Sequence, residues 1–362
     1  MVNALTSLLS HSIRQASRAA LKYCPKLNVK FQSKYNISAQ KTALLQSGIP
    51  LRLYSSQPDP SPQSKVGRKK VTINTLRKLY EQGKPITMMT AHDYPTGNWV
   101  EKSELDICLV GDSLAMVALG FDSTIPVTMD IMIHHASAVS RAAKTPFLVV
   151  DMPFGSYERR PQLGLENAIR LMKEANAEAV KLEGGIEQAG VIEEITQAGI
   201  PVMGHIGLTP QKHVMLGGFR VQGKTADKAL QLMEDAFALQ EAGCMGMVLE
   251  CIPAPIAEYI TDQLSIPTIG IGSGSGCSGQ VLVMMDTLGI YDKFVPKFCK
   301  QFGQLNAPAV EALRSYSDEI KERSFPSHEF SYPMPEVEVE RFLKLAAKRF
   351  PRQSTHSRAI IN

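Results

Sequence analysis

The stretch PFLVVDMPFGSYERRPQLGLENAIRLMKEANAEAVKLEGG, residues 146–185, contains the pattern that decides the fold. Two apolar segments, PFLVV and AVKLE, have the length of buried strands, and GLENAIRLMKEANA between them has the periodicity of an amphipathic helix. Each apolar segment leads to a carboxylate, Asp151 in one case and Glu183 in the other. A strand, a helix and a second strand in this order predict two parallel strands joined by a helical crossover.

The same alternation continues along the chain from Val71. Further strand candidates are ITMMTA (86–91), ICLVG (107–111), PVMGH (201–205), MGMVLE (245–250), PTIGIG (267–272) and KFVPKF (293–298). Strands alternating with helices in this number predict a closed (β/α)8 TIM barrel, with a short helix before it at 75–82 and extra helices after it. An open, doubly wound sheet is the main alternative. However, ITMMTAHDYP lacks the glycine-rich pattern that follows the first strand of such sheets.

Changes in composition and stretches of proline, serine and other turn-forming residues divide the chain into four parts. The predicted parts are a mitochondrial transit peptide at 1–54, a linker at 55–70, the barrel at 71–324, and a C-terminal extension at 325–362 with one helix and a disordered tail. The linker prediction rests on QPDPSPQSK, which is rich in proline, serine and other polar residues.

The first part has the composition of a mitochondrial leader. No Asp or Glu occurs before Asp59, whereas Arg14, Arg18 and Lys22 recur at intervals of four and so share one helix face. The negative potential inside the matrix would draw such a helix inward. The alternative is a basic N-terminal tail without a targeting role. We therefore predict localisation in the mitochondrial matrix.

Composition also narrows the classes of partner. The chain is 44% hydrophobic and 20% charged with a net charge of +4, as in an ordinary globular protein. No basic stripe with interleaved aromatic residues predicts nucleic-acid binding, and no apolar run is long enough to span a bilayer. The six cysteines are scattered without a CxxC pair, which argues against a zinc site and a disulfide framework. Small-molecule substrates are the expected partners.

Carboxylates at successive strand ends suggest a metal site. Asp112, Asp151 and Glu183 end three consecutive strands, and the carboxyl ends of barrel strands meet at one rim. Oxygen ligands with room for water and substrate suit Mg²⁺, whereas zinc would favour accompanying His or Cys residues. The alternative for each residue is a helix cap or a pairing with a basic side chain.

Three further strand-end residues could complete a catalytic site. Lys181 shares a strand face with Glu183 and could hold a substrate carboxylate or enolate, or form only a salt bridge. Glu250 ends MGMVLE with no basic neighbour in sequence, so it could be a general base of raised pKa or a rim salt bridge. His205 could donate to an anion or be structural. Together these residues predict metal-assisted enolate chemistry on a 2-oxo acid.

At these residues the chain resembles the ketopantoate hydroxymethyltransferase family. The matching blocks are MMTAHDYP, LVGDSLAM, GFDSTIPVTMD, VVDMPFGSY, AVKLEGG, GHIGLTPQ, GGFRVQGK, VLECIP and IGIGSGSGCSGQVLV, which cover roughly 72–298 in order. The resemblance implies a (β/α)8 barrel and a homo-oligomer, a decamer in some members. It also implies hydroxymethyl transfer from 5,10-methylenetetrahydrofolate to 3-methyl-2-oxobutanoate, which gives 2-dehydropantoate for pantothenate and coenzyme A biosynthesis.

The resemblance also implies roles residue by residue. The family's Mg²⁺ site corresponds to Asp112, Asp151 and Glu183, its substrate-binding residues to Asp112, Ser113, Asp151, Lys181 and His205, and its proposed base to Glu250. Three positions depart from the common pattern. Many members have Asp at Ser278 and His at Met285, and Tyr is common at His92. The first two departures concern loop detail and folate affinity rather than the reaction.

Two other functions remain possible on the sequence alone. One is a related Mg²⁺-dependent barrel enzyme of the phosphoenolpyruvate mutase or isocitrate lyase type, although the KKCGH-like loop of isocitrate lyases is absent from the sequence. The other is a catalytically silent homologue, which loss of Asp112, Asp151 or Glu250 would have indicated. The presence of these carboxylates favours an active enzyme.

Overall fold

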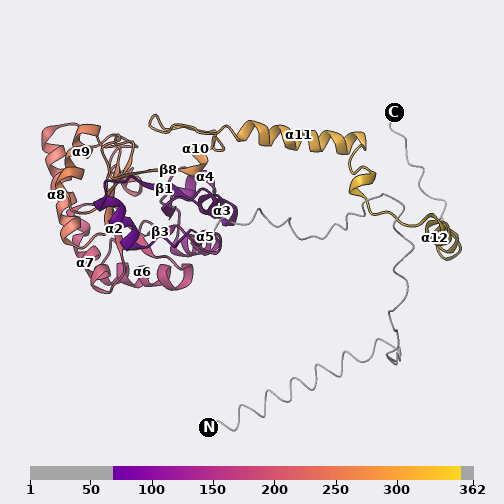
Figure 1. Ribbon diagram of the computed structural model, residues 1–362, viewed down its shortest axis with the longest axis horizontal. Coiled ribbons are helices and arrows are strands. Elements are labelled where there is room, and N and C mark those ends of the chain that lie inside the picture. The colour runs from indigo at the N-terminus through magenta and orange to yellow at the C-terminus, as the bar shows by residue number, and fades with distance from the viewer. Residues whose placement is uncertain (1–67, 352–362) are drawn as a thin grey trace, which may run out of the picture. The chain divides into compact units, whose positions relative to one another are not determined.

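The strands of this protein close into a single parallel barrel (Figure 1). A computed structural model describes residues 68–351, so the predicted transit peptide, most of the predicted linker and nearly all of the predicted tail lie outside the described residues. The strands are β1 Ile86–Thr90, β2 Ile107–Val110, β3 Phe147–Asp151, β4 Ala179–Lys181, β5 Val202–Gly207, β6 Gly246–Glu250, β7 Thr268–Ile271 and β8 Gly279–Leu282. Each strand pairs in parallel with the next, and β8 pairs with β1.

The helices that alternate with the strands are α3 Tyr94–Lys102, α4 Leu114–Val117, α5 Met129–Ala142, α6 Pro161–Ala175, α7 Ala189–Gln197, α8 Ala226–Glu241, α9 Ala254–Gln263 and α10 Met284–Thr287. α2 Ile73–Glu81 precedes the first strand, and α11 Asn306–Glu322 and α12 Glu336–Arg349 follow the barrel. Figure 1 shows α5, α6, α7, α8 and α9 arranged in order around the sheet. The predicted (β/α)8 barrel is therefore confirmed.

The strands separate two apolar clusters. In β2, Ile107 and Leu109 belong to a cluster that contains residues from all of the strands. Cys108 and Val110 belong to a second cluster, which also contains residues from the helices. Successive strand residues point to opposite faces, so the first cluster fills the barrel and the second joins the barrel to its helices. This alternation also decides which residues at the strand ends face inward.

The predicted eighth strand is wrong. KFVPKF (293–298) forms no strand, and β8 lies earlier, at Gly279–Leu282. Pro296 cannot donate a ladder hydrogen bond, which disfavours a strand between two others. The true strand, GQVL, contains only two apolar residues, so it lacks the apolar run that marks the other strands in the sequence. Gly279 is required there, since a Cβ atom at this position would lie 2.3 Å from the carbonyl oxygen of Ile86.

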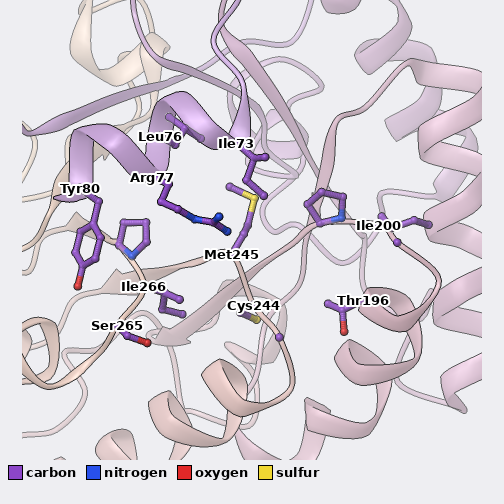
Figure 2. A pocket seen from close by; sticks show the side chains of 14 residues that line it. Ile73, Leu76, Arg77, Tyr80, Thr196, Ile200, Cys244, Met245, Ser265 and Ile266 are labelled. Carbon is purple, nitrogen blue, oxygen red and sulfur yellow. The ribbon is translucent and has the colours of Figure 1, made fainter. Parts of the chain in front are cut away.

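The short leading helix closes the N-terminal end of the barrel. Thr72 caps α2 by accepting a hydrogen bond from the Thr75 backbone N–H, and Leu76 joins the cluster inside the barrel. A cavity of about 350 Å³ lies between α2 and the loops that precede β5, β6 and β7. Figure 2 shows Arg77 extending from α2 into this cavity, above Met245. The predicted helix at 75–82 is thus present, although it begins two residues earlier.

The extra helices that the sequence predicts after the barrel are α11, within the predicted 71–324 part, and α12, within the predicted extension at 325–362. Neither α11 nor α12 buries a side chain. Several of their apolar residues are more than half exposed, namely Leu313, Tyr316, Phe342, Leu343 and Leu345. Within residues 68–351, no helix combines the length and apolarity that crossing a membrane requires.

Candidate active site

The C-terminal ends of β3 to β6 carry charged side chains into the barrel. The inward cluster contains Val149, Ala179, Met203 and Val248, and two residues further along the same strands stand Asp151, Lys181, His205 and Glu250. Because side chains alternate with a period of two, these four residues share the inward face. Glu183 continues the series beyond Lys181 and is 1% exposed. Strand geometry therefore assembles the residues that the sequence singled out.

Lys181 lies at the centre of this group. Its Nζ atom is 3.0 Å from Asp151 Oδ1 and 3.2 Å from His205 Nδ1. Burial alone would lower the pKa of Lys181, but the carboxylates of Asp151, Glu183 and Asp112 outweigh it and raise the pKa. Burial and the nearby ammonium group hold the pKa of His205 well below its usual value. The site thus contains a charged lysine beside a neutral imidazole.

A buried glutamine connects two of the predicted metal ligands. The side-chain amide of Gln211 donates to Asp112 Oδ2 at 2.8 Å and to the Met152 carbonyl at 2.9 Å. Its backbone N–H donates to Glu183 Oε2 at 3.0 Å, and its Oε1 accepts from the Tyr157 hydroxyl at 2.6 Å. These bonds fix the orientation of both carboxylates, as outer-shell partners commonly do at metal sites.

Sequence reasoning missed the roles of Gln211 and Tyr157. Both occur in blocks that carry the family resemblance, GHIGLTPQ and VVDMPFGSY, but neither block shows which of its polar residues point inward. Gln211 belongs to a short 3₁₀ turn at Pro210–Lys212, outside any strand, so alternation could not place it. Its position beyond a strand end was the only available signal.

Glu250 faces His205 across the top of the barrel. Its Oε2 atom lies 3.1 Å from His205 Nε2, and its side chain is 14% exposed. Burial raises the pKa of Glu250 to about 7, although Lys181 acts in the opposite direction. The sequence showed no basic neighbour for this residue, whereas the fold supplies an imidazole. A carboxylate with this pKa can exchange a proton near neutral pH.

The backbone around Glu250 adopts unusual conformations that fix the end of β6. Cys251, the next residue, has a φ of 51°, in the left-handed region that residues with a Cβ atom rarely occupy. Across the sheet, Gly207 has a φ of 95°, and a Cβ atom there would lie 2.2 Å from the Glu250 carbonyl oxygen. That carbonyl instead accepts from the Leu208 N–H at 2.8 Å. Strain of this kind is often found beside functional residues.

The site has more negative than positive charge. When Asp112, Asp151, Glu183 and Glu250 are ionised, Lys181 leaves a net excess of three negative charges. Burial, followed by repulsion from Asp151, raises the pKa of Asp112 to about 7. Burial, followed by repulsion from Asp112, raises the pKa of Glu183 well above its usual value. An uncompensated excess of buried charge is costly unless a cation joins the group.

Hard oxygen donors and excess negative charge fit a divalent cation such as Mg²⁺. The Asp112 backbone N–H donates to Asp151 Oδ2 at 3.1 Å, which brings these two carboxylates to adjacent positions. Among residues 68–351, no three His, Cys, Asp or Glu side chains by themselves form a group that could hold a metal ion. Mg²⁺ usually takes one or two carboxylates and completes its octahedron with water and substrate oxygens. Two adjacent carboxylates without a third protein ligand are therefore compatible with a Mg²⁺ site.

A cavity of about 570 Å³ opens above the charged group. Its lining includes the residues predicted to bind substrate, Asp112, Ser113, Asp151, Lys181 and His205, together with Glu183 and Glu250. The structure therefore brings all seven sequence-predicted site residues to one cavity. The two unusual positions Ser278 and Met285 are not part of its lining. Ser278 exchanges hydrogen bonds with Thr268 at the start of β7, and Met285 packs in the outer core.

Fold and site together define a class of protein. Buried acidic and basic side chains at the carboxyl ends of parallel barrel strands, above a cavity, are the arrangement of a (β/α)8-barrel enzyme. Among solved structures, phosphonopyruvate hydrolase in complex with oxalate and Mg²⁺ matches with a TM-score of 0.48 and 12% identity, covering 77% of this chain and 99% of that chain. This likeness is too distant to support a functional inference.

Sequence comparison identifies the family. The ketopantoate hydroxymethyltransferase family model matches residues 70–328. A 3-methyl-2-oxobutanoate hydroxymethyltransferase of Emericella nidulans is 52% identical over 279 residues, covering 76% of this chain and 80% of that protein. One of Heliobacterium modesticaldum is 53% identical over 266 residues, covering 74% and 96%. A rice relative, from Oryza sativa subsp. japonica and named as mitochondrial, is 48% identical over 287 residues, covering 77% and 79%. The chain belongs to the ketopantoate hydroxymethyltransferase family.

Proposed function

We propose that this enzyme transfers a hydroxymethyl group from 5,10-methylenetetrahydrofolate to 3-methyl-2-oxobutanoate and uses Mg²⁺. Family membership supports the 2-oxo acid and the one-carbon transfer. The observation that carries the chemistry is Glu250, a mostly buried carboxylate with its pKa raised to about 7, on the same cavity as Lys181 and the acidic group. Removing a proton next to a keto group requires such a base.

Asp112 and Asp151 would hold the cation, and Glu183 would bind it either directly or through water. The support is the donor set, the adjacency of Asp112 and Asp151, and the excess of negative charge around them. A bound Mg²⁺ would polarise the 2-oxo group and make the neighbouring C–H bond more acidic. Gln211 would keep two of these carboxylates in position through its amide and its backbone N–H.

The remaining polar residues would position the acid for proton removal. Lys181 and Ser113 would bind its carboxylate, and the neutral His205 would donate a hydrogen bond to an oxygen that gains negative charge. Glu250 would accept the proton from C3, the carbon that carries the methyl groups. Its raised pKa matches it to this task near neutral pH, because about half of the carboxylate is then ionised and the ionised form is a stronger base than an ordinary glutamate.

The transfer then forms one carbon–carbon bond. C3 of the substrate attacks the one-carbon unit of the folate, whose bonds to the two folate nitrogens break, and tetrahydrofolate leaves. One water molecule is consumed overall, and its oxygen becomes the hydroxyl group of 2-dehydropantoate. The folate supplies carbon at the oxidation level of formaldehyde, so no oxidant or reductant is needed.

The proposal is tested by product formation with the full chain. The protein is incubated with 3-methyl-2-oxobutanoate, Mg²⁺ and 5,10-methylenetetrahydrofolate, and 2-dehydropantoate is measured by mass spectrometry. We expect product that requires the folate, disappears with EDTA and returns when Mg²⁺ is restored. A folded, metal-loaded protein that forms no product would contradict the proposal.

We further propose mitochondrial targeting by residues 1–54 and assembly as a homo-oligomer such as a decamer. Mitochondrial targeting is supported by the basic N-terminal sequence, which lacks Asp and Glu, and by two rice relatives that are named as mitochondrial. A fusion of residues 1–54 to a fluorescent protein that stays in the cytosol would contradict the targeting.

Assembly is supported by the apolar side chains exposed on α11 and α12, because soluble monomers rarely expose such residues in groups. A monomeric mass by light scattering would contradict the assembly.

A further inference from the structure

The cavity above the charged group extends well beyond it. Its volume of about 570 Å³ is in the range of pockets for ligands of drug size, and a small 2-oxo acid would fill only part of it. Away from the charged group, the lining is rich in aromatic residues, including Tyr291, Phe294 and Phe298. The cavity therefore has room for a second, flatter ligand beside the acid.

One acidic residue on this lining has no hydrogen-bond or ion-pair partner among residues 68–351. Asp286 belongs to α10, directly after β8, and is 8% exposed. No side-chain or backbone donor within residues 68–351 forms a hydrogen bond with its carboxylate, and no basic group there reaches ion-pair distance. α10 is itself held in place, since the Met284 N–H donates to Thr90 Oγ1 at 2.9 Å. Its oxygens are not among the buried polar atoms that lack a hydrogen-bond partner, so they are accessible from the cavity and open to a donor on a bound ligand.

The environment of Asp286 differs from that of the metal-site carboxylates. Burial alone raises its pKa, to about 6, with no contribution from a neighbouring acid or base. It stands at the end of β8, whereas Asp112, Asp151 and Glu183 belong to β2, β3 and β4 and the segments directly after them. A divalent cation bound by those residues would leave Asp286 unsatisfied. A ligand donor to Asp286 would therefore come from a different group in the same cavity.

We propose that Asp286 binds the amino-pyrimidinone edge of the folate's pterin ring, an inference that rests on the proposed folate dependence. That edge presents two parallel N–H donors, the exocyclic amino group and the adjacent ring N–H. A carboxylate accepts such a pair through both oxygens, with the same bidentate geometry that it uses for arginine. Asp286 is thus a residue for recognition of the one-carbon donor, separate from the proton-transfer residues.

Other residues on the lining fit the rest of such a ligand. Tyr291, Phe294 and Phe298 offer apolar, aromatic surfaces for a flat ring. Arg220 and Lys297 offer positive charge for the carboxylates of a folate's glutamate tail. Glu250 lines the same cavity, so a donor bound through Asp286 shares one chamber with the base and the 2-oxo acid.

The test measures binding of tetrahydrofolate to the full chain by calorimetry, with and without Asp286→Asn. Asparagine keeps the shape but replaces one acceptor oxygen with a donor, so we expect Kd to rise on the order of 10- to 100-fold. Asp292→Asn, which removes the same charge from an exposed position nearby, is the control and should leave Kd unchanged. A melting curve of each variant checks that it is folded.

A ligand without the exocyclic amino group sharpens the test. A 2-desamino analogue of tetrahydrofolate should bind the wild type weakly, and Asp286→Asn should cost it little further affinity, because the two changes remove one interaction. If the analogue and Asp286→Asn each reduce affinity by an independent, additive amount, the assignment of Asp286 would be overturned.

The outcomes also separate this inference from the proposed function. Equal affinity of the wild type and Asp286→Asn for tetrahydrofolate would overturn the inference and leave the proposed function standing. If the wild type binds no tetrahydrofolate, both proposals fail. A changed oligomer mass with unchanged Kd would overturn the inference and point to a basic residue of a partner subunit.

Discussion

The two ends of the barrel use the same kind of residue in opposite ways. Asp106 and Glu178 stand directly before β2 and β4, at the N-terminal end. Asp106 accepts from the backbone N–H and hydroxyl of Thr87 at 2.9 and 2.7 Å and pairs with Arg68 at 2.9 Å. Glu178 accepts from the Leu148 N–H at 2.9 Å and pairs with Lys70. Each carboxylate there has its own donors and its own cation.

At the C-terminal end, four carboxylates share one lysine. Asp112, Asp151, Glu183 and Glu250 all line the cavity that contains Lys181, and the neighbouring imidazole of His205 is neutral. The comparison teaches that a carboxylate at a strand end is not by itself a sign of catalysis. What separates the ends is whether donors and cations within the chain satisfy the acid, or whether a ligand must do so.

The largest expected effect comes from neutralising one acid at the C-terminal end. Asp112→Asn should lower kcat/KM by about 10³- to 10⁴-fold, because the cation would lose a charged ligand. The same change should raise the melting temperature of the metal-free protein, since it removes one of several repelling charges while an amide oxygen can still accept from Gln211. Steady-state kinetics and calorimetric melting measure the two effects. A variant with reduced stability would argue against electrostatic crowding at this end.

The base should give the next largest effect and a pH signature. Glu250 must be ionised to accept a proton, so exchange of the substrate's C3 hydrogen should rise as pH increases through about 7 and then level off. Glu250→Gln should slow this exchange by about 10²- to 10³-fold and abolish that rise. NMR in D₂O follows the exchange directly. An unchanged pH profile in the variant would exclude Glu250 as the base.

Loss of the glutamine that orients the carboxylates should have a moderate effect. Gln211→Met keeps the length of the side chain but removes the hydrogen bonds that the side-chain amide donates to Asp112 and to the Met152 carbonyl. We therefore expect kcat/KM to fall about 10- to 100-fold. The Mg²⁺ concentration for half-maximal rate should rise in parallel, which a purely structural role would not produce. Gln197→Met, on the exposed face of α7, is the matched control and should behave as wild type.

The smallest effect on activity is expected at the N-terminal end. Asp106→Ala leaves the Thr87 N–H and hydroxyl without their acceptor and removes the ion pair with Arg68, so the free energy of unfolding should fall by about 1–3 kcal/mol. The value of kcat/KM should stay within about twofold of wild type, because Asp106 lies at the opposite end of the strands. Urea unfolding and kinetics on one preparation provide both numbers. A large kinetic loss would weaken the contrast between the ends.

The sequence was most informative where one simple period controls the geometry. Alternation along β3 to β6 predicts that Asp151, Lys181 and Glu183 face inward, and the structure places them there. The prediction from the sequence was wrong at β8, where GQVL lacks a long apolar run and the more apolar KFVPKF resembles a strand more closely. Pro296 within KFVPKF was the physical argument against a strand there.

Loop residues could not be placed from the sequence. Gln211 and Tyr157 reach the site because a 3₁₀ turn after β5 and the loop after β3 fold over the strand ends. No periodicity links a loop residue to a direction in space, so only their contacts reveal their roles. His205 beside Glu250 is a similar case, since residues 45 positions apart become neighbours only when β5 pairs with β6.

Hydrogen exchange at C3 of 3-methyl-2-oxobutanoate, measured by NMR in D₂O without folate, tests the central claim most directly. The full-length wild type is compared with Asp112→Asn at one end of the barrel and Asp106→Asn at the other. We expect exchange that needs Mg²⁺ in the wild type, persists in Asp106→Asn and is lost in Asp112→Asn. Equal exchange in all three proteins, or equal loss in both variants, would contradict the claim that the unsatisfied carboxylates are the ones that perform the chemistry.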